Sequence, residues 1–413
     1  MWQLSTVATC PLVICRDAID VLYKRLPARI AGLLLLLLSG FSSAAFAVNV
    51  TDHWDVGGAV RFRADQESRR NIHNIGIDTV MLSTAYRSDS WMGAASYRWY
   101  GAQYPYHYTE HFGDIQFLQY AWIGYKFSAE RELHVGLNKV PFGLQPLYSS
   151  SFWETLGNLV GMEDVYMVGV KYMQNLGDWH LQTGYYARPM WPGQGTSNGT
   201  TYSVVVTPAD PGVVGGNRNQ ERNLFVGRLA RDFVLGDWKS EAGVSVLGSD
   251  LYNDDTHRNG RRYSYALHYA GQKDGWGVKF QYARQDMAPK NPDSEQVITV
   301  GGYDGTFNVA TRGNLYVGDL SYRLADSYFG GWLSNVKFYG MYSMYEKSNP
   351  DFRNSQRFTL GTSFSVKPLS IYIEWLNGRN DPYIGGSSYT QSLAAGGFDR
   401  WRSKLYMNIA YYF

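Results

Sequence analysis

The chain has 413 residues, of which 45% are hydrophobic and 16% aromatic, with 44 glycines, 33 tyrosines and 13 tryptophans. Its mean hydropathy is mildly polar, which excludes a bundle of apolar transmembrane helices. The formal net charge is only +2, so bulk electrostatics give no reason to expect a nucleic-acid partner.

The N-terminal 47 residues predict a secretory signal peptide. The basic stretch "KRLPAR" precedes an apolar run, "AGLLLLLL" at 31–38, which is too short to cross a bilayer as a helix. Small residues follow and end in "AFA" at 45–47, as a cleavage site requires. We therefore expect cleavage after Ala47 and a mature domain at 48–413. The competing interpretation of the apolar run is a buried core helix, and a translation start near residue 24 would shorten the leader.

Removing this leader changes the composition of the mature chain. Both cysteines, Cys10 and Cys15, lie in the leader, so neither a disulfide nor a thiolate metal site is expected in the mature protein. The leader also holds four of the 38 basic and two of the 36 acidic residues. The mature chain is therefore neutral, with equal numbers of both.

From residue 48 onward the hydrophobic period is two, which is the period of a β-strand with different solvents on its two faces. In "RFTLGTSFSV" at 357–366, for example, Phe358, Leu360 and Phe364 alternate with Thr359, Ser363 and Ser365. Most such segments are about ten residues long, the length that a tilted strand needs to cross a bilayer. Sixteen segments are predicted, near 54–64, 76–87, 91–100, 115–127, 131–139, 165–174, 178–188, 222–233, 238–248, 261–271, 275–285, 312–323, 335–346, 356–366, 369–378 and 402–413.

The connections between these segments alternate between short and long. The long ones lie near 65–75, 101–114, 140–164, 189–221, 249–260, 286–311, 347–355 and 379–401. This alternation predicts an all-β fold: a closed antiparallel transmembrane β-barrel of about 16 strands, in an up-and-down meander with all long loops at one end. Sixteen strands leave an interior that side chains cannot fill, so the polar inner face is expected to line water.

Four tryptophans stand directly after a short turn, two of them in the repeated sequence "LGDW" at 176–179 and 235–238. These residues, Trp91, Trp179, Trp238 and Trp276, would lie at one height on the outer wall. Indole rings at one level are typical of a membrane–water interface. Coincidental placement at strand starts is the alternative.

The last strand ends in "AYYF", and the stretches "HVGLNKVPFGLQPLYSSSFWE" (134–154) and "GMEDVYMVGVKYM" (161–173) flank the third long loop. These features resemble Gram-negative outer-membrane porins, and the loop is most similar to the phosphate-selective porin O and P group. The resemblance implies an inward third loop, a homotrimer, export through the periplasm, and contacts with outer-membrane lipid and lipopolysaccharide.

The alternation assigns more basic than acidic side chains to the inner wall, which predicts a mild anion preference. The third loop, 140–164, has no lysine or arginine, which departs from the phosphate-selective pattern and disfavours phosphate specificity. We expect acids of this loop to face basic wall residues and to form a transverse field at a constriction. The candidates are Glu154, Glu163 and Asp164 from the loop, and Arg61, Arg63, Arg98 and Arg357 from the wall.

The expected function is passive diffusion of small hydrophilic solutes or ions through a water-filled channel. Loop aromatics such as Phe152 and Trp153 leave a sugar-guiding porin open as an alternative. A barrel-embedded hydrolase would need a Ser–His pair on the outer wall, and a plugged structural barrel would need a blocked lumen. Neither is favoured, and no catalytic residue, metal, cofactor or nucleic-acid partner is expected.

Overall fold

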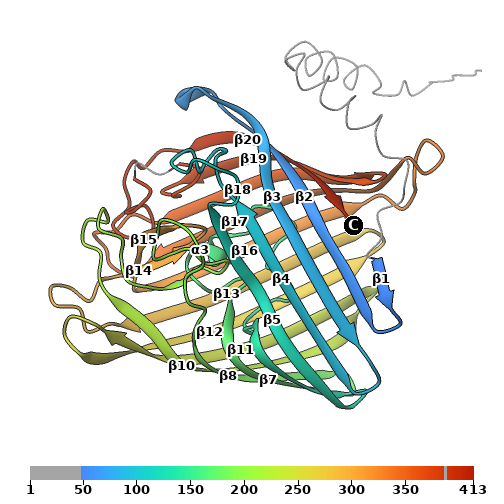
Figure 1. Cartoon of the computed structure of the whole chain (residues 1–413), viewed down its shortest axis with the longest axis horizontal. Coiled ribbons are helices and arrows are strands. Elements are labelled where there is room, and N and C mark those ends of the chain that lie inside the picture. Colours follow the sequence, from blue (N-terminus) through green and yellow to red (C-terminus); the bar gives the residue numbers. More distant parts are fainter. Residues whose placement is uncertain (1–47, 386–387) are drawn as a thin grey trace, which may run out of the picture. The chain divides into compact units, whose positions relative to one another are not determined.

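The computed structural model describes residues 48–385 and 388–413, so the predicted signal peptide, 1–47, lies outside the described residues. Sixteen antiparallel strands form a closed barrel, because the last strand also pairs with the first of the ring (Figure 1). The strands are β2 (Trp54–Glu67), β3 (Ile72–Arg87), β4 (Trp91–Tyr100), β5 (Ile115–Ser128), β6 (Arg131–Lys139), β7 (Tyr166–Leu176), β8 (Trp179–Pro189), β10 (Asn219–Leu235), β11 (Trp238–Asn253), β12 (Arg258–Lys273), β13 (Trp276–Ala288), β16 (Arg312–Arg323), β17 (Leu333–Lys347), β18 (Ser355–Val366), β19 (Leu369–Arg379) and β20 (Arg402–Tyr412). The predicted fold class and strand number are confirmed.

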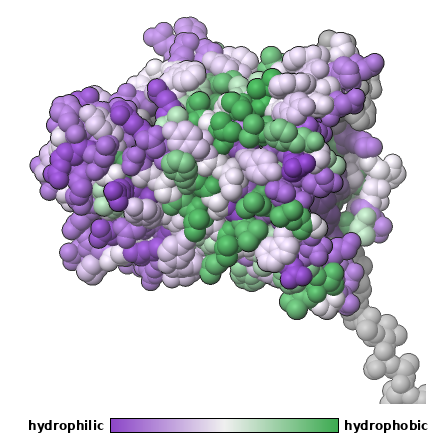
Figure 2. Space-filling model, turned by 90° about the horizontal axis from the view of Figure 1, so that it is seen from below, coloured by the Kyte–Doolittle hydropathy of each residue, from purple (hydrophilic) through white to green (hydrophobic). Residues whose placement is uncertain are grey.

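Side chains along each strand point alternately to the outer wall and to the interior of the barrel. On β12, Tyr263, Tyr265 and Leu267 are exposed on the outer wall, whereas Arg262 and His268 are buried inside the barrel. Figure 2 shows hydrophobic side chains gathered in a band across the wall, with hydrophilic side chains over the loops. In the described part of the chain, no helix combines the length and apolarity that a transmembrane span requires.

The strands agree with the predicted segments within a few residues, and the larger differences lie at the long-loop end. β10 begins at Asn219 and β11 ends at Asn253, each several residues beyond the predicted limits. The two asparagines are paired in the ladder and their amides are hydrogen-bonded to each other. Hydrophobic alternation marks only the lipid-facing part of a strand, so it stops before the hydrogen-bonded ladder does.

The two "LGDW" turns have the local geometry that their sequences require. Gly177 and Gly236 occupy left-handed backbone positions, with φ of 61° and 60°, which favour glycine. The following Trp179 is exposed on the outer wall and lies 5.3 Å beneath the guanidinium of Arg231. Trp91 is likewise exposed and packs edge-on against Tyr125. We call this end of the barrel, where the short turns lie, the short-turn end.

Four further strands lie outside the predicted set. β1 (Val48–Thr51) adds a short hairpin to β2 at the short-turn end. β9 (Val205–Val206), β14 (Val297–Gly302) and β15 (Gly305–Ala310) form a separate three-stranded sheet inside two of the long loops. We call it the loop sheet. Its strands have at most six residues, which is shorter than a strand that crosses a membrane, so they were not among the predicted segments.

The inner face of the barrel is not uniformly polar, which corrects the expectation from the strand pattern. Inward residues of β10–β17, including Leu247, Leu315 and Val317, are buried in an apolar core. The core also contains Phe142 from the third loop and Phe307 from the loop sheet. Alternation assigns a residue to the inner face, but it cannot tell whether water or an inserted loop covers that face.

Candidate pore constriction

The third loop, residues 140–165, lies inside the barrel and carries the short helix α3 (Leu156–Leu159), seen within the ring of strands in Figure 1. Side chains of the inner wall bind its backbone, so the buried peptide groups of the loop find partners. The amide nitrogens of Gly143 and Phe152 donate to Ser245 Oγ (3.0 Å) and Glu374 Oε1 (2.8 Å). The partners follow one another around the barrel: Arg228, Ser245, Arg262, Lys279, Gln281, Asp319, Ser343, Arg357 and Glu374.

These contacts attach the loop to the wall from β10 to β19. Arg228 donates from Nε to the carbonyl of Gly143 at 2.7 Å, and the Lys279 ammonium donates to the carbonyls of Leu147 and Ser149. The apolar core lies alongside the same strands. The loop therefore has both polar and apolar attachment on one side of the barrel.

Glu163, a predicted constriction acid, ties the loop to itself. Its carboxylate accepts hydrogen bonds from the amide nitrogens of Tyr148 (2.7 Å) and Thr155 (3.0 Å) and from the Thr155 hydroxyl (2.6 Å). Only 1% of Glu163 is exposed. The side chain closes the loop across fifteen residues rather than facing the lumen.

Asp164 and Glu154 lie near each other at the end of the loop. Asp164 forms an ion pair with Lys139 and accepts a hydrogen bond from the Tyr202 hydroxyl at 2.5 Å. Glu154 is partly buried and adopts a left-handed backbone with φ of 56°. Burial, with the Asp164 and Glu163 carboxyls nearby, raises the pKa of Glu154 well above its usual range. The protonated, uncharged form of Glu154 is thereby favoured.

The four predicted wall arginines lie in different settings. Arg357 donates to the carbonyls of Trp153 and Glu154 and forms an ion pair with Asp381 at 2.7 Å. Arg61 lies 5.5 Å from the Phe152 ring and donates to the Tyr412 hydroxyl.

Arg63 is held by two bonds to Asp65, at 2.6 and 2.9 Å, and by one to Asp78. Arg98 lies 4.5 Å above the Tyr202 ring. Arg63 also lies 5.9 Å from the Trp153 ring, so Arg357, Arg61 and Arg63 all lie near Phe152–Glu154 of the loop. Arg98 lies beside Tyr202, which binds Asp164. Among the described residues, none of the four pairs with a carboxylate of the third loop, and the transverse field stays a prediction.

Some residues of this region were missed from the sequence. Asp65 is 2% exposed and binds both Arg63 and Lys404, the latter at 2.5 Å. Its position two residues after Arg63 places it on the same strand face, so the alternation contained the signal. Asp381, the partner of Arg357, lies in a loop and had no such signal.

Aromatic rings surround the tip of the third loop. Trp153 packs against Tyr383 (6.0 Å between centroids) and Tyr406 (5.2 Å), and Phe152 packs against Tyr372 (5.2 Å). Tyr406 is buried beneath these rings. The predicted loop aromatics therefore hold the tip against β19 and β20.

Asp304 joins three of the long loops. Its carboxylate accepts bonds from the amides of Thr196 and Ser197, the Thr200 hydroxyl and the Tyr108 hydroxyl. The loop 189–221 thus folds onto the loop sheet, and its Val204–Val206 segment is buried in the apolar core.

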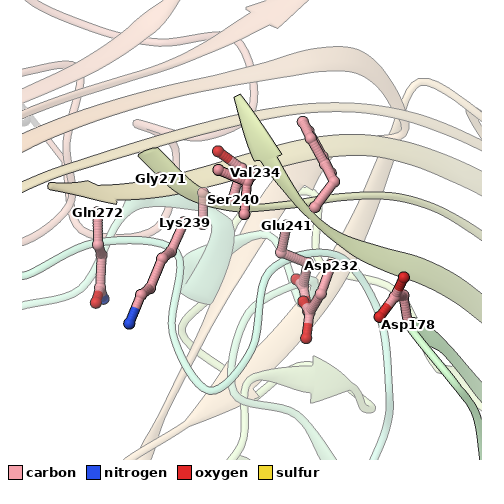
Figure 3. A pocket seen from close by; sticks show the side chains of 10 residues that line it. Asp178, Asp232, Val234, Lys239, Ser240, Glu241, Gly271 and Gln272 are labelled. Atoms are coloured by element: carbon pink, nitrogen blue, oxygen red, sulfur yellow. The ribbon is translucent and has the colours of Figure 1, made fainter. Parts of the chain in front are cut away.

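A cavity of about 560 Å³ lies between the ends of β10, β11 and β12 near the short turns (Figure 3). Asp178, Asp232, Lys239 and Glu241 line it, so both signs of charge are present. Glu241 is already bound by Arg228 at 2.6 Å and His268 at 3.1 Å. Groups of three or more metal-ligating side chains are absent from the described residues.

The fold was compared with known proteins. The outer-membrane channel DcaP of Acinetobacter baumannii matches with a TM-score of 0.56 and 11% identity, over 90% of this chain and 100% of that chain. The anion-selective porin of Comamonas acidovorans matches with a TM-score of 0.51 and 13% identity, over 87% and 99%. OmpT, an outer membrane protein of Vibrio cholerae, matches in its trimer form with a TM-score of 0.51 and 12% identity, over 90% and 100%.

No family profile and no curated protein sequence matches the chain. The structural neighbours do not single out the phosphate-selective group within the porins. At 11–13% identity these likenesses establish the fold alone. The chain thus shares its architecture with outer-membrane porins and channels.

Proposed function

We propose that this chain is an outer-membrane porin of a Gram-negative bacterium, through which small hydrophilic solutes diffuse passively. The observation that carries the proposal is the closed sixteen-strand barrel, with an apolar outer wall and a third loop hydrogen-bonded inside it. Such a wall buries its apolar side chains in lipid and leaves its charged inner side chains to water.

A mild anion preference is part of the proposal. Of the predicted constriction acids, Asp164 is paired with Lys139, Glu163 is bound within the loop, and burial favours the uncharged form of Glu154. On the wall, Arg61 and Arg98 form no ion pair within the described part of the chain. Uncompensated cations on the inner wall make the potential of the lumen more positive, which raises the local concentration of anions.

The remaining expectations concern processing, partners and assembly. We propose that residues 1–47 direct export through the periplasm and that the barrel contacts lipid and lipopolysaccharide. A homotrimer is supported by the trimer form of the Vibrio cholerae neighbour. The exposed tryptophans at the short-turn end suit the membrane–water interface.

Planar-bilayer recording of the refolded mature chain, residues 48–413, tests the proposal. We expect steady conductance in potassium chloride and a reversal potential, in a salt gradient, that indicates anion preference. Conductance with clear cation preference would remove the anion proposal and leave the porin proposal standing.

A plugged structural barrel is the second candidate, because the third loop and the loop sheet fill the interior beside β10–β17 with apolar side chains. The same recording separates the two functions. A plugged barrel gives no steady current, whereas a porin conducts through the space beside the remaining strands.

A further inference from the structure

The cavity of about 560 Å³ at the short-turn end is a space on the inner wall that a solute can enter. Pairing between strands places its polar side chains together, because Asp232 lies opposite Glu241 and Lys239 lies opposite Gln272. They point to the interior, since Arg231, the residue before Asp232, lies on the outer wall. Asp232 and Lys239 are both exposed, so the cavity is open to water.

The first "LGDW" turn differs from the second in the partner of its aspartate. In the second turn, Asp237 forms an ion pair with Lys273 at 2.8 Å. In the first turn, Asp178 lines the cavity and pairs with no cation among the residues that the structure describes. The Asp178 carbonyl accepts a hydrogen bond from the amide nitrogen of Asp232 at 2.8 Å. This bond attaches the turn to β10, so two aspartates lie at one edge of the cavity (Figure 3).

The carboxylate of Asp232 is held in place but remains accessible. His180 Nε2 lies 2.9 Å from its Oδ2, and yet the Asp232 side chain is 59% exposed. Glu241, by contrast, is already bound by both Arg228 and His268. The two aspartates, and not Glu241, are therefore the acids that a solute can bind.

Lys239 supplies a positive charge at the opposite edge of the cavity. Figure 3 shows its side chain beside that of Gln272 and away from Asp178 and Asp232. Within the described ranges, 48–385 and 388–413, the Lys239 ammonium forms no ion pair, although three acids line the same cavity. The cavity therefore has a negative edge and a positive edge that do not neutralise each other.

Two separated charges of opposite sign favour a solute that carries both. A simple anion would pair with the lysine but approach the aspartates, and a simple cation would meet the reverse arrangement, so each loses part of what it gains. A zwitterion with its charges several bonds apart gains at both edges. An amide between the two charges would also suit the Gln272 carboxamide, which both donates and accepts hydrogen bonds. A dipeptide has all of these features.

From this arrangement we propose that the cavity is a binding site for short zwitterionic peptides, with the ammonium at Asp178 and Asp232 and the carboxylate at Lys239. The site lies at the short-turn end, so a peptide reaches it from the water at that end of the barrel. The proposal rests on the porin function proposed above and names a solute class for that pore.

The test measures how glycylglycine lowers the chloride current through the full mature chain in planar bilayers. We expect a saturable decrease for the wild type. The decrease should be weaker with N-acetylglycine, which lacks the ammonium, and with glycylglycine amide, which lacks the carboxylate. Lys239→Gln should raise the half-maximal glycylglycine concentration roughly ten-fold, because a charge-assisted hydrogen bond is lost, and should leave the response to glycylglycine amide unchanged.

Lys273→Gln is the matched control, since Lys273 lies at the same end of the barrel but is paired with Asp237 outside the cavity, and it should respond like the wild type. Asp232→Asn should weaken the response to glycylglycine but not to N-acetylglycine, and it carries the test if Lys239→Gln does not insert. Equal responses to the three solutes, including no response, or a Lys239→Gln variant that responds like the wild type, overturn the peptide site while conductance leaves the porin standing. A wild type without any conductance overturns the porin function and this proposal with it.

Discussion

The two sides of the barrel interior are built from the same alternating strands but behave differently. Along β10–β17 the inner face binds the third loop through Arg228, Ser245 and Gln281 and packs against it through Leu315. Along β2–β4 and β20 the inner face instead carries Arg61, Arg63, Arg98 and Lys404 among tyrosine rings. We call these the buttress side and the cationic side. The difference indicates that the buttress side fixes the backbone of the loop, whereas the cationic side holds the loop tip through aromatic and cation–π contacts.

The largest expected effect is on the apolar packing of the buttress side. Leu315→Ala removes a side chain that is 0% exposed, and the cavity should lower the free energy of unfolding by about 4 kcal/mol. Leu320→Ala, on the outward face of the same β16 and 51% exposed, is the matched control and should cost much less. Urea unfolding in detergent or lipid vesicles measures both. Equal losses would contradict the assignment of two different environments to one strand.

The second prediction compares the stability lost when an arginine is replaced on the buttress side and on the cationic side. Arg228→Gln should cost about 3 kcal/mol, because Glu241 loses its 2.6 Å partner and the Gly143 carbonyl loses a donor. Arg61→Gln on the cationic side breaks no ion pair of the described residues and should cost under about 1 kcal/mol. The same unfolding measurement reports both values. A larger loss for Arg61→Gln would show that the cationic side also supports the fold.

The third prediction concerns the closure of the loop on itself. Glu163→Ala leaves the buried amides of Tyr148 and Thr155 without their acceptor and should lower the free energy of unfolding by about 2 kcal/mol. It should also make single-channel current noisier, because the loop is less constrained. Glu154→Ala in the same loop removes no side-chain hydrogen bond of the described residues and serves as the control. If the current through Glu163→Ala is no noisier than that of the wild type, the order of the loop does not depend on this carboxylate.

The smallest effect is on selectivity and involves Glu154. Its raised pKa means that it stays uncharged to higher pH than an ordinary glutamate and ionises as the pH rises through that value. The new negative charge lies near Glu163 and Asp164 of the loop, Lys139 of β6 and Arg98 of β4, so anion preference should fall. Reversal potentials across a pH series measure this change. Glu154→Gln should abolish the pH-dependent step, and a step that persists in it would assign the titration to another group.

The strands of the barrel wall were more predictable from the sequence than the contacts inside the barrel. The sixteen membrane strands follow from the period of two and the loop lengths, because lipid and water impose opposite demands on neighbouring residues. The predicted acids Glu163 and Asp164 were located in the right loop, but their partners Thr155 and Tyr202 were not foreseen. Their roles depend on how the loop folds back, and no periodic pattern reports that.

The sequence by itself determined the barrel, its strand number and the sorting of long and short connections, since each is a local consequence of alternation between two solvents. Only the tertiary structure decided which inner side chains contact the third loop and that the loop sheet forms within the long loops. It also decided that Arg98, among the described residues, has no carboxylate partner, unlike Arg63 and Arg357. These features join residues far apart in the chain, such as Gly143 with Ser245, 102 positions away, so they arise from closure of the barrel and not from any local pattern.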